Sequence, residues 1–220
     1  MASVLSPFGL RPINLIGGQA FNGGVIREFS VASNNSAAIF NGDLVVLSSA
    51  GLPSAVSATP VAIKIPSTSA DATAGIVGVC VGCRYIDSTG ITQYRQFLPA
   101  NIITAGATEV FVRVMDDPDA LLQVQGTAAL GTFNSGTDGS GWPGAIGKNA
   151  ELGFATAGKT STGNSGVNLI VGTNGAGLVT TSTYAVRIVD VVDGTQTDDF
   201  PEFIVKLNVG VHSYTNSLGV

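Results

Sequence analysis

Short runs of β-branched and aromatic residues recur along this chain, and turn-forming residues separate them. The runs are rich in Val, Ile, Phe, Tyr and Thr, and the breaks are rich in Gly, Asn, Asp, Ser and Pro. Strands favour the first set and tight turns favour the second, so the pattern predicts an antiparallel all-β fold. We expect strands over residues 25–31, 43–48, 61–65, 75–86, 93–98, 109–114, 121–125, 167–171, 184–192 and 203–211.

Several of these runs alternate with the period of two that a half-buried strand requires. In the run 109–114, three valines alternate with Glu, Phe and Arg, and the run 203–211 alternates in a similar way. No window of about 15 residues keeps an apolar stripe at helical spacing. Helix is therefore expected only as a turn or two, near 100–103 or 118–121. The predicted fold is an antiparallel β-barrel or β-sandwich with little helix.

Residues 1–24 differ from the rest of the chain. They contain the steps Ser6-Pro7 and Arg11-Pro12, which favour extended backbone before each proline, and two Gly-Gly pairs. Their apolar side chains are too few to close a core of their own. We therefore predict an extended N-terminal arm that packs on another surface.

The remaining residues, 25–220, are long enough for one sizeable β domain with a real core. Two stretches within it, 126–147 and 158–177, are rich in Gly and other turn formers, and the first contains Trp142, the only tryptophan. We expect long Gly-rich loops there, as loop-rich insertions in the β domain. No internal repeat at a fixed period is found.

Charged residues make up only 11% of the chain, against about 25% in an average soluble domain. A surface with so few charges resists self-association weakly, which favours assembly into something larger. The ten basic residues are spread singly, and the net charge is -5. A nucleic-acid partner requires clustered Lys and Arg, and so does an anionic membrane surface, so we expect neither partner.

The sequence shows neither a secretory signal nor a membrane-spanning run. No apolar run approaches the roughly 20 residues that span a bilayer, and the N-terminal stretch lacks an early basic region. The chain has two cysteines and no secretory signal, which predicts a reducing compartment and no disulfide framework.

The two cysteines, Cys80 and Cys83, have the Cys-x-x-Cys spacing of redox dithiols and of half a zinc site. In an extended strand, residues three apart point to opposite faces, with Cα atoms roughly 10 Å apart, beyond disulfide reach. No helix is predicted after Cys83 to activate a thiol, and only one histidine could complete a zinc site. We interpret both cysteines as small packing residues inside a strand.

That histidine, His212, lies near the C-terminus. A Ser-His-Asp arrangement with a distant serine is conceivable, but no Gly-x-Ser-x-Gly elbow is present. A strand-end or interface position is the preferred interpretation. The glycine pairs do not form a phosphate-binding loop, and glycines inside a strand pattern more often mark a bulge or close backbone packing.

Acidic residues cluster twice, each time after a predicted strand. Asp in these positions commonly forms turns, and calcium binding is the functional alternative. Neither cluster has EF-hand spacing, and no spacing selects an aspartic-protease or glycosidase pair. The clusters are Asp116, Asp117 and Asp119, and Asp190, Asp193, Asp198 and Asp199.

Six segments carry a family resemblance and none has a catalytic signature. They are residues 6–12, 17–18, 39–45, 76–85, 116–119 and 147–152. On these segments the chain resembles virion structural proteins of tailed phages of aquatic bacteria, including cyanophages. The order of 42–47, Gly51 and 75–78 also looks like the small β-barrel of phage head-decoration proteins.

The resemblance implies a capsid decoration (cement) protein that is made in the host cytoplasm and lies on the outer surface of the virion head. Its partners would be the major capsid protein and further copies of itself, in a homotrimer or a dimer. A protein of this kind needs contact area rather than an active site, so we expect no enzymatic activity, cofactor or bound metal. Five residues of the apolar arm are the predicted capsid contacts: Leu5, Phe8, Leu10, Arg11 and Ile13.

Two other hypotheses stay open. A tail or fibre component could bind the host surface or glycans through aromatic residues such as Trp142, Tyr184 or Tyr214. An acidic hydrolase could use the Asp clusters, and it has only those carboxylates in its favour.

Overall fold

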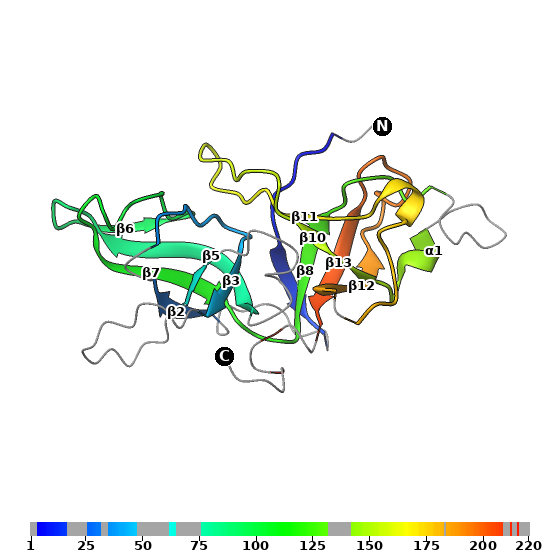
Figure 1. Cartoon of the computed structure of the whole chain (residues 1–220), viewed down its shortest axis with the longest axis horizontal. Coiled ribbons are helices and arrows are strands. Elements are labelled where there is room, and N and C mark those ends of the chain that lie inside the picture. The colour runs from blue at the N-terminus through cyan, green and yellow to red at the C-terminus, as the bar shows by residue number, and fades with distance from the viewer. Residues whose placement is uncertain are drawn as a thin grey trace.

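The chain folds into antiparallel β-sheets, as the sequence predicts (Figure 1). The computed structural model describes residues 4–16, 26–31, 35–47, 62–64, 76–131, 142–182, 184–208, 212 and 215. Strands account for 44% of the structure and helix for 5%, and the open sheets fit a sandwich rather than a closed barrel. Residues 132–141 of the loop 126–147, and residues 1–3 and 17–24 of the predicted arm, lie outside the described residues.

The first sheet contains most of the strands from the N-terminal half of the chain. Its hydrogen-bonded order is β2-β7-β5-β3-β4, and β6 pairs with β5. The long strand β5 lies at its centre and bends at several register shifts. The strands are β2 (Ile26–Ser30), β3 (Leu44–Leu47), β4 (Ala62–Lys64), β5 (Ile76–Ile86), β6 (Thr92–Arg95) and β7 (Thr108–Met115).

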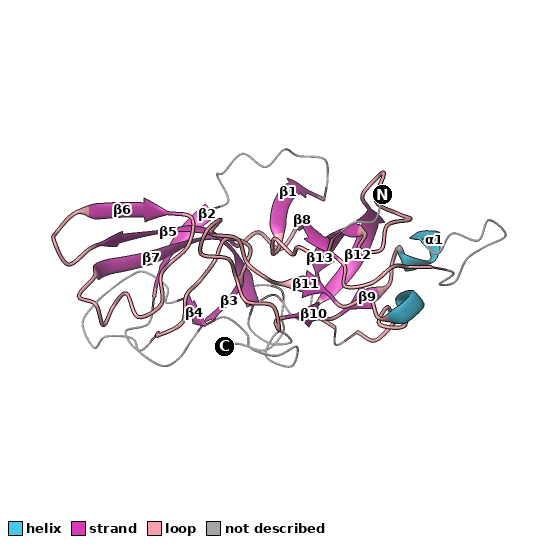
Figure 2. Cartoon of the chain, turned by 90° about the horizontal axis from the view of Figure 1, so that it is seen from above, coloured by secondary structure: helices cyan, strands magenta, loops and turns pink. Residues whose placement is uncertain are grey.

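The second sheet lies beside the first along the long axis of the molecule (Figures 1 and 2). Its order is β1-β8-β13-β12-β9, and a two-stranded sheet β10-β11 adjoins it. The strands are β1 (Arg11–Leu15), β8 (Ala120–Gln125), β9 (Asn149–Ala150), β10 (Leu152–Gly153), β11 (Asn168–Leu169), β12 (Val186–Val191) and β13 (Glu202–Leu207).

Strand β1 is the largest difference from the sequence-based expectation. The N-terminal segment was expected to pack on another surface, but Arg11 to Leu15 pair with Gln123 to Ala120 of β8. β1 forms the outer edge of the second sheet, where a proline such as Pro12 is tolerated because only one side of the strand needs ladder hydrogen bonds. Part of the predicted arm therefore completes the chain's own sheet.

Two buried clusters use opposite faces of the first sheet. The larger cluster joins both sheets: Leu44, Ile76 and Met115 from the first sheet pack with Leu122 and Phe203 from the second. Burial of so much apolar surface from both sheets holds them together. The smaller cluster lies on the other face of the first sheet and includes Phe29, Val45, Val77, Leu98 and Val112.

Helix is short, but it lies elsewhere than expected. Residues 100–106 and 118–119 form turns, whereas the described helices are α1 (Trp142–Ala145) and the 3-10 turn η2 (Thr173–Gly175). In the turn at 101–107, the N–H of Ala105 donates to Asn101 O, and the N–H of Gly106 donates to Ile103 O. Gly106, with φ of 92°, then ends the turn before it becomes a helix.

Candidate functional site

Three of the resemblance segments meet at one buried junction between the two sheets. The N–H of Leu10 donates to Gly42 O at 2.9 Å, and the N–H of Gly42 donates to Cys80 O at 2.8 Å. Gly9 and Gly42 have φ of 80° and 91°, and a Cβ at Gly9 would lie 2.6 Å from Ser165 Cβ. Only glycine permits so close an approach in that conformation. Segments far apart in the sequence are thus packed backbone to backbone.

Asp43 lies at the centre of this junction, with only 4% of its surface exposed. Its Oδ2 accepts the N–H of Phe40 at 2.7 Å, and its Oδ1 accepts the hydroxyl of Ser165. Ser165 Oγ in turn accepts the N–H of Val167 at 3.0 Å, which ties the junction to the stretch leading into β11. Burial raises the pKa of Asp43 to about 6, although the two hydrogen bonds oppose the shift.

A second set of contacts fixes the residues that precede the junction. The side-chain amide of Gln125 accepts the N–H of Ser6 at 2.8 Å and donates to Val4 O at 3.2 Å. Lys159 Nζ donates to Ser6 Oγ at 2.9 Å. Residues 4–6 are therefore held in one extended conformation by β8 and by the loop after β10.

The five predicted capsid contacts occupy different positions. Leu10 has no exposed surface and belongs to the large buried cluster, so it anchors the segment in the chain's own core. Leu5 is 41% exposed, and the guanidinium of Arg11 lies 4.5 Å from the centre of the half-buried Phe8 ring. Ile13 is half-buried within β1. The structure thus leaves Leu5, Phe8 and Arg11 accessible and encloses Leu10.

Both cysteines are free and buried in the smaller cluster. The expectation that they point to opposite faces of β5 is wrong: the register shifts between Cys80 and Gly82, so Cys80 pairs with Val114 and Cys83 pairs with Val112. Gly82, with φ of 146°, forms this bulge and turns both thiols to one side. Burial raises the pKa of Cys80 to about 12 and that of Cys83 to about 11.

We expect the two thiols to be inert in the native protein. At pH 8 only about 0.1% of a thiol with a pKa near 11 is thiolate, so modification by a disulfide reagent should be at least a hundredfold slower than in denaturant. Absorbance at 412 nm during reaction with 5,5′-dithiobis(2-nitrobenzoate), with and without urea, measures both rates. Rapid modification of both thiols in the native protein would contradict the packing role.

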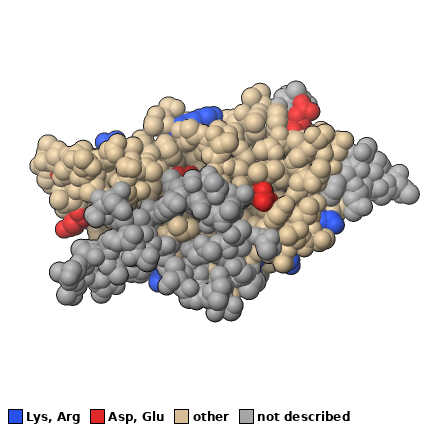
Figure 3. Space-filling model, in the orientation of Figure 1, with Lys and Arg blue, Asp and Glu red and all other residues tan. Residues whose placement is uncertain are grey.

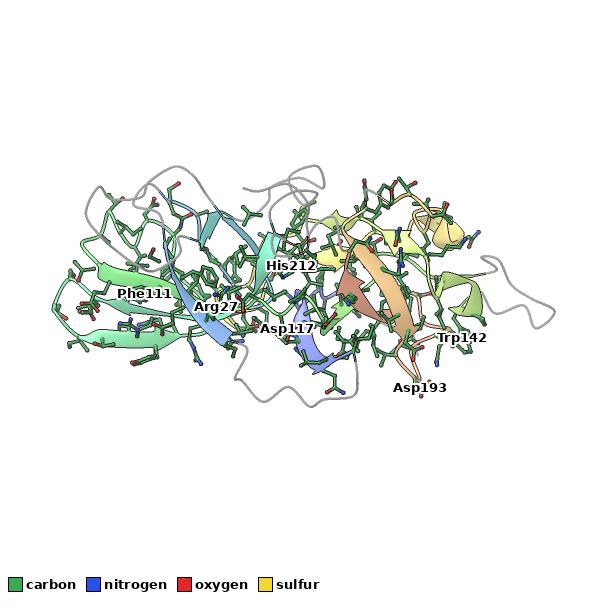
Figure 4. The ribbon with its side chains drawn as sticks, turned by 90° about the horizontal axis from the view of Figure 1, so that it is seen from below. Arg27, Phe111, Asp117, Trp142, Asp193 and His212 are labelled. Carbon is green, nitrogen blue, oxygen red and sulfur yellow. The ribbon has the colours of Figure 1, made fainter. Side chains whose placement is uncertain are left out.

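His212 is buried, with 1% of its surface exposed. Its backbone forms a parallel β-bridge with Ile76, and its backbone N–H donates to Asn208 O at 3.3 Å. Figure 4 shows it in the middle of the molecule, near Arg27 and Asp117. Burial lowers the pKa of the imidazole, although nearby Asp116 opposes the shift.

The first acidic cluster lies in the segment that crosses from β7 to β8. Asp116 forms an ion pair with Arg27 of β2, in the first sheet, and Asp119 Oδ1 lies 2.5 Å from Lys206 Nζ of β13, in the second. Asp117 Oδ1 accepts the N–H of Asp119 at 2.8 Å. Asp116 and Asp119 thus tie the crossing segment to the first and the second sheet, respectively, and Asp117 holds the turn between them.

In the second acidic cluster, Asp190 lies in β12 and the other three residues lie in the turn between β12 and β13, at the far end of the second sheet, where Figure 4 shows Asp193. Asp190 Oδ1 accepts the N–H of Val191 at 2.8 Å, and Asp193 Oδ1 accepts from the amide of Gln196 at 2.9 Å. Among the residues that the structure describes, no group of three or more His, Cys, Asp or Glu side chains is placed to share a metal ion.

The aromatic residues named for glycan binding do not form a platform. Trp142 is half-buried against the large cluster, Tyr184 is half-buried, and Tyr214 lies outside the described residues. Tyr94 on β6, which the sequence does not single out, is instead the most exposed described aromatic, at 72%.

Charged side chains are sparse and scattered on the face shown in Figure 3. The Lys and Arg side chains visible there lie in separate places, which agrees with the isolated basic residues of the sequence. In the described part of the chain, no helix is both long and apolar enough to cross a bilayer.

The described contacts define an all-β fold in which two antiparallel sheets share a common core and a clamped N-terminal segment. Comparisons with protein-family models, with curated proteins and with solved structures give no match.

Three residues that organise the site were not predicted from the sequence: Ser165, Gln125 and Lys159. Each acts on a segment at least 119 positions away in the chain, as the bonds of Ser165 to Asp43 and Gln125 to Ser6 show. Such partners leave no local signal. Gln125 follows the alternation of its strand, on the same face as Gln123, so its burial could not be foreseen from the pattern.

Proposed function

We propose that this chain is a capsid decoration protein that binds the outer surface of a phage head and stabilises contacts between major capsid protein subunits. The proposal rests on the resemblance of its sequence segments and on one structural observation. Of the six large apolar side chains that are exposed in the described residues, two are adjacent in this segment: Val4, at 77%, and Leu5, at 41%. Exposed apolar residues gathered in one short segment are typical of a surface that a partner covers.

The segment supports binding because it is already ordered. Gln125 and Lys159 hold residues 4–6 extended, and Leu10 anchors them in the core. Val4, Leu5, Phe8 and Arg11 are here called the N-terminal surface. A partner that covers this surface gains apolar burial without having to order the backbone that carries it. Repetition of one modest contact over many copies on a shell then gives strong overall attachment.

Stabilisation of the head follows from mass action. A ligand that binds only the assembled shell shifts the equilibrium toward the assembled state. The proposal includes self-association at local symmetry axes, with a trimer preferred over a dimer by analogy with head-decoration proteins, and a chain with 11% charged residues opposes such association weakly. A tail or fibre component is the alternative, and imaging of labelled virions separates the two by location and copy number.

Substitution of Leu5 by Asp tests the N-terminal surface. Placing a charge in an apolar contact should weaken binding to capsids assembled from the major capsid protein about tenfold or more. Cosedimentation of the purified protein with these capsids measures the dissociation constant. Leu5 is exposed and lies outside both sheets, so the fold should be unaffected.

Ile146→Asp is the matched control, because Ile146 is 42% exposed and follows α1, away from the N-terminal surface. It should bind capsids like the wild type. Deletion of residues 1–24 is less informative, since it removes Leu10 and β1 from the chain's own core and sheet. Equal capsid binding by Leu5→Asp and the wild type would remove the N-terminal surface from the proposal.

A further inference from the structure

Strand β6 is an edge strand with one side unpaired in the described part of the chain. It pairs only with β5, in a register that places Tyr94 opposite Arg84 and Gln93 opposite Tyr85. Figure 2 shows β6 at the margin of the first sheet, in the upper left of the view. The open side of such a strand presents a row of backbone N–H and C=O groups, which another strand can extend.

The turn that leads into β6 determines which backbone groups face outward. The N–H of Asp87 donates to Ile91 O at 3.0 Å, so Ile91 directs its backbone groups toward β5. In an antiparallel ladder this direction alternates from one residue to the next. Thr92 and Tyr94 therefore direct their N–H and C=O groups away from the sheet. None of the hydrogen bonds found among the described residues uses these groups.

The loop 160–163 leaves room along this edge. A cleft of about 380 Å³, with a mostly polar lining, separates the loop from residues 93–97. Gln96 Nε2 donates to Asn164 Oδ1 at 2.9 Å, so the loop is held at the residue that follows β6. A polar cleft beside open backbone groups suits the backbone of an extended strand.

A second copy of β6 complements this edge. When Gln93 of each copy lies opposite the other, Thr92 of one copy pairs with Tyr94 of the second copy, and the two-fold symmetry repeats this pair. Both residues point outward, so each pair exchanges both of its N–H···O bonds. The two Gln93 residues then form the non-hydrogen-bonded pair at the axis.

The charges of β6 favour this register. Arg95 is its only charged residue and would lie opposite Ile91 of the second copy. The two Arg95 residues would then be about 14 Å apart, beyond the Debye length at physiological salt. A register centred on Tyr94 would instead bring them to roughly 7 Å, where like charges repel.

Two exposed apolar side chains flank the edge and would gain cover from the pairing. Tyr94 is 72% exposed and Ile91 is 60% exposed. In the register centred on Gln93, the Tyr94 ring lies against Thr92 of the second copy, and an aromatic residue beside a β-branched one stabilises a sheet. Ile91 lies against the aliphatic stem of Arg95 of the second copy.

We infer that two copies of this chain associate through their β6 strands, which pair antiparallel about a two-fold axis at Gln93 and continue the first sheet into the second copy. The contact shares no residue with the N-terminal surface. It gives the self-association in the proposed function a location, but it rests on the β6 edge, so either can fail without the other. A two-fold contact joins copies in pairs, as a dimer or between neighbouring trimers.

A cysteine at the axis tests the pairing in the purified full-length protein, without capsids. In Gln93→Cys the two Cα atoms would lie about 4.5 Å apart, within disulfide reach. Mild oxidation followed by non-reducing gel electrophoresis should therefore show a disulfide-linked dimer. Cys80 and Cys83 are buried and should not compete for the oxidant.

Ile91→Cys is the matched control, because residue 91 is more exposed than residue 93 and lies on the same side of the strand. Its two cysteines would lie about 14 Å apart in the proposed register, so the dimer should form at least about tenfold more slowly. Equal rates for the two variants would indicate random collision. That result would overturn the inference, and so would the absence of a dimer from Gln93→Cys.

Tyr94→Pro, added to Gln93→Cys, tests whether backbone groups carry the contact. It removes an outward N–H and leaves the ladder to β5 intact, so the dimer should form about tenfold more slowly. Tyr94→Ala keeps that N–H and should slow the reaction less. Circular dichroism checks that both variants are folded. An unchanged rate in the folded Tyr94→Pro variant would exclude pairing through β6. Leu5→Asp should not alter the rate, whatever its effect on capsid binding.

Discussion

Gly78→Ala should destabilise the protein by more than about 3 kcal/mol, the upper end of what added core volume usually costs. A Cβ at this position would lie 1.9 Å from the carbonyl oxygen of Met115 and 2.9 Å from Asp116 Cα. These are backbone atoms of β7 and of the crossing to β8, so no flexible side chain can move aside. Urea unfolding followed by circular dichroism gives the free energy of unfolding of both proteins.

Gly194→Ala separates this clash from the general cost of losing a glycine. Gly194 has φ of 85° and no atom within 4 Å of an added Cβ, so the substitution should cost only about 1 kcal/mol, through backbone strain. A free energy of unfolding for Gly78→Ala within 1 kcal/mol of the wild type would mean that β5 and β7 do not approach as closely as described.

The free energy of unfolding should fall by about 3 kcal/mol between pH 3 and pH 7 because of Asp43 alone. Its pKa is about 6 in the folded protein and 3.8 as the ordinary value. Below pH 3.8 the carboxyl is neutral in both states and its burial costs least. As the pH rises through this window, the unfolded chain releases the proton first, so the unfolded state is favoured. Above about pH 7 the carboxyl is ionised in both states and the loss is complete.

Asp43→Asn isolates this contribution because its amide stays neutral at every pH. Subtracting the free energy of unfolding of the variant from that of the wild type cancels the other titrating groups, and the difference should decrease by about 3 kcal/mol from pH 3 to pH 7. Urea unfolding at half-unit pH steps provides the values. A difference that does not change with pH would show that Asp43 is not buried at the junction.

Ser165→Ala refines the same experiment. The Ser165 hydroxyl donates to Asp43 Oδ1 and so favours the carboxylate form. Without that hydrogen bond the pKa of Asp43 should rise further, and the pH at which stability stops falling should move upward. No movement of this pH would place Ser165 away from the carboxylate.

Alternating runs in the sequence predict most strands of the first sheet within a few residues, because one side of each run is buried. The run expected over 109–114 is β7, Thr108–Met115, with its valines in the core. The N-terminal segment could not be assigned in this way. Its Pro12 argues against a central strand, and only the partner strand β8, distant in sequence, shows that this is an edge.

The site was predictable only in part, for a similar reason. Glycines inside the strand pattern indicate close backbone packing, and the contact of Gly78 with Met115 confirms it. The exposure of Leu5 and the burial of Leu10 depend on which face of a distant sheet the segment meets. The common side of Cys80 and Cys83 depends on a bulge at Gly82, whereas regular strand geometry predicts opposite sides.

The pairing of β1 with β8 also determines when the protein becomes complete during translation. Ser6 and Gln125 are 119 positions apart, and β8 is itself paired with β13, which ends at Leu207. Because synthesis starts at the N-terminus, nearly the whole chain must be made before β8 is fully paired and residues 4–6 are clamped. Under the proposed function, prematurely terminated chains lack the ordered surface, so growing particles would incorporate only finished molecules.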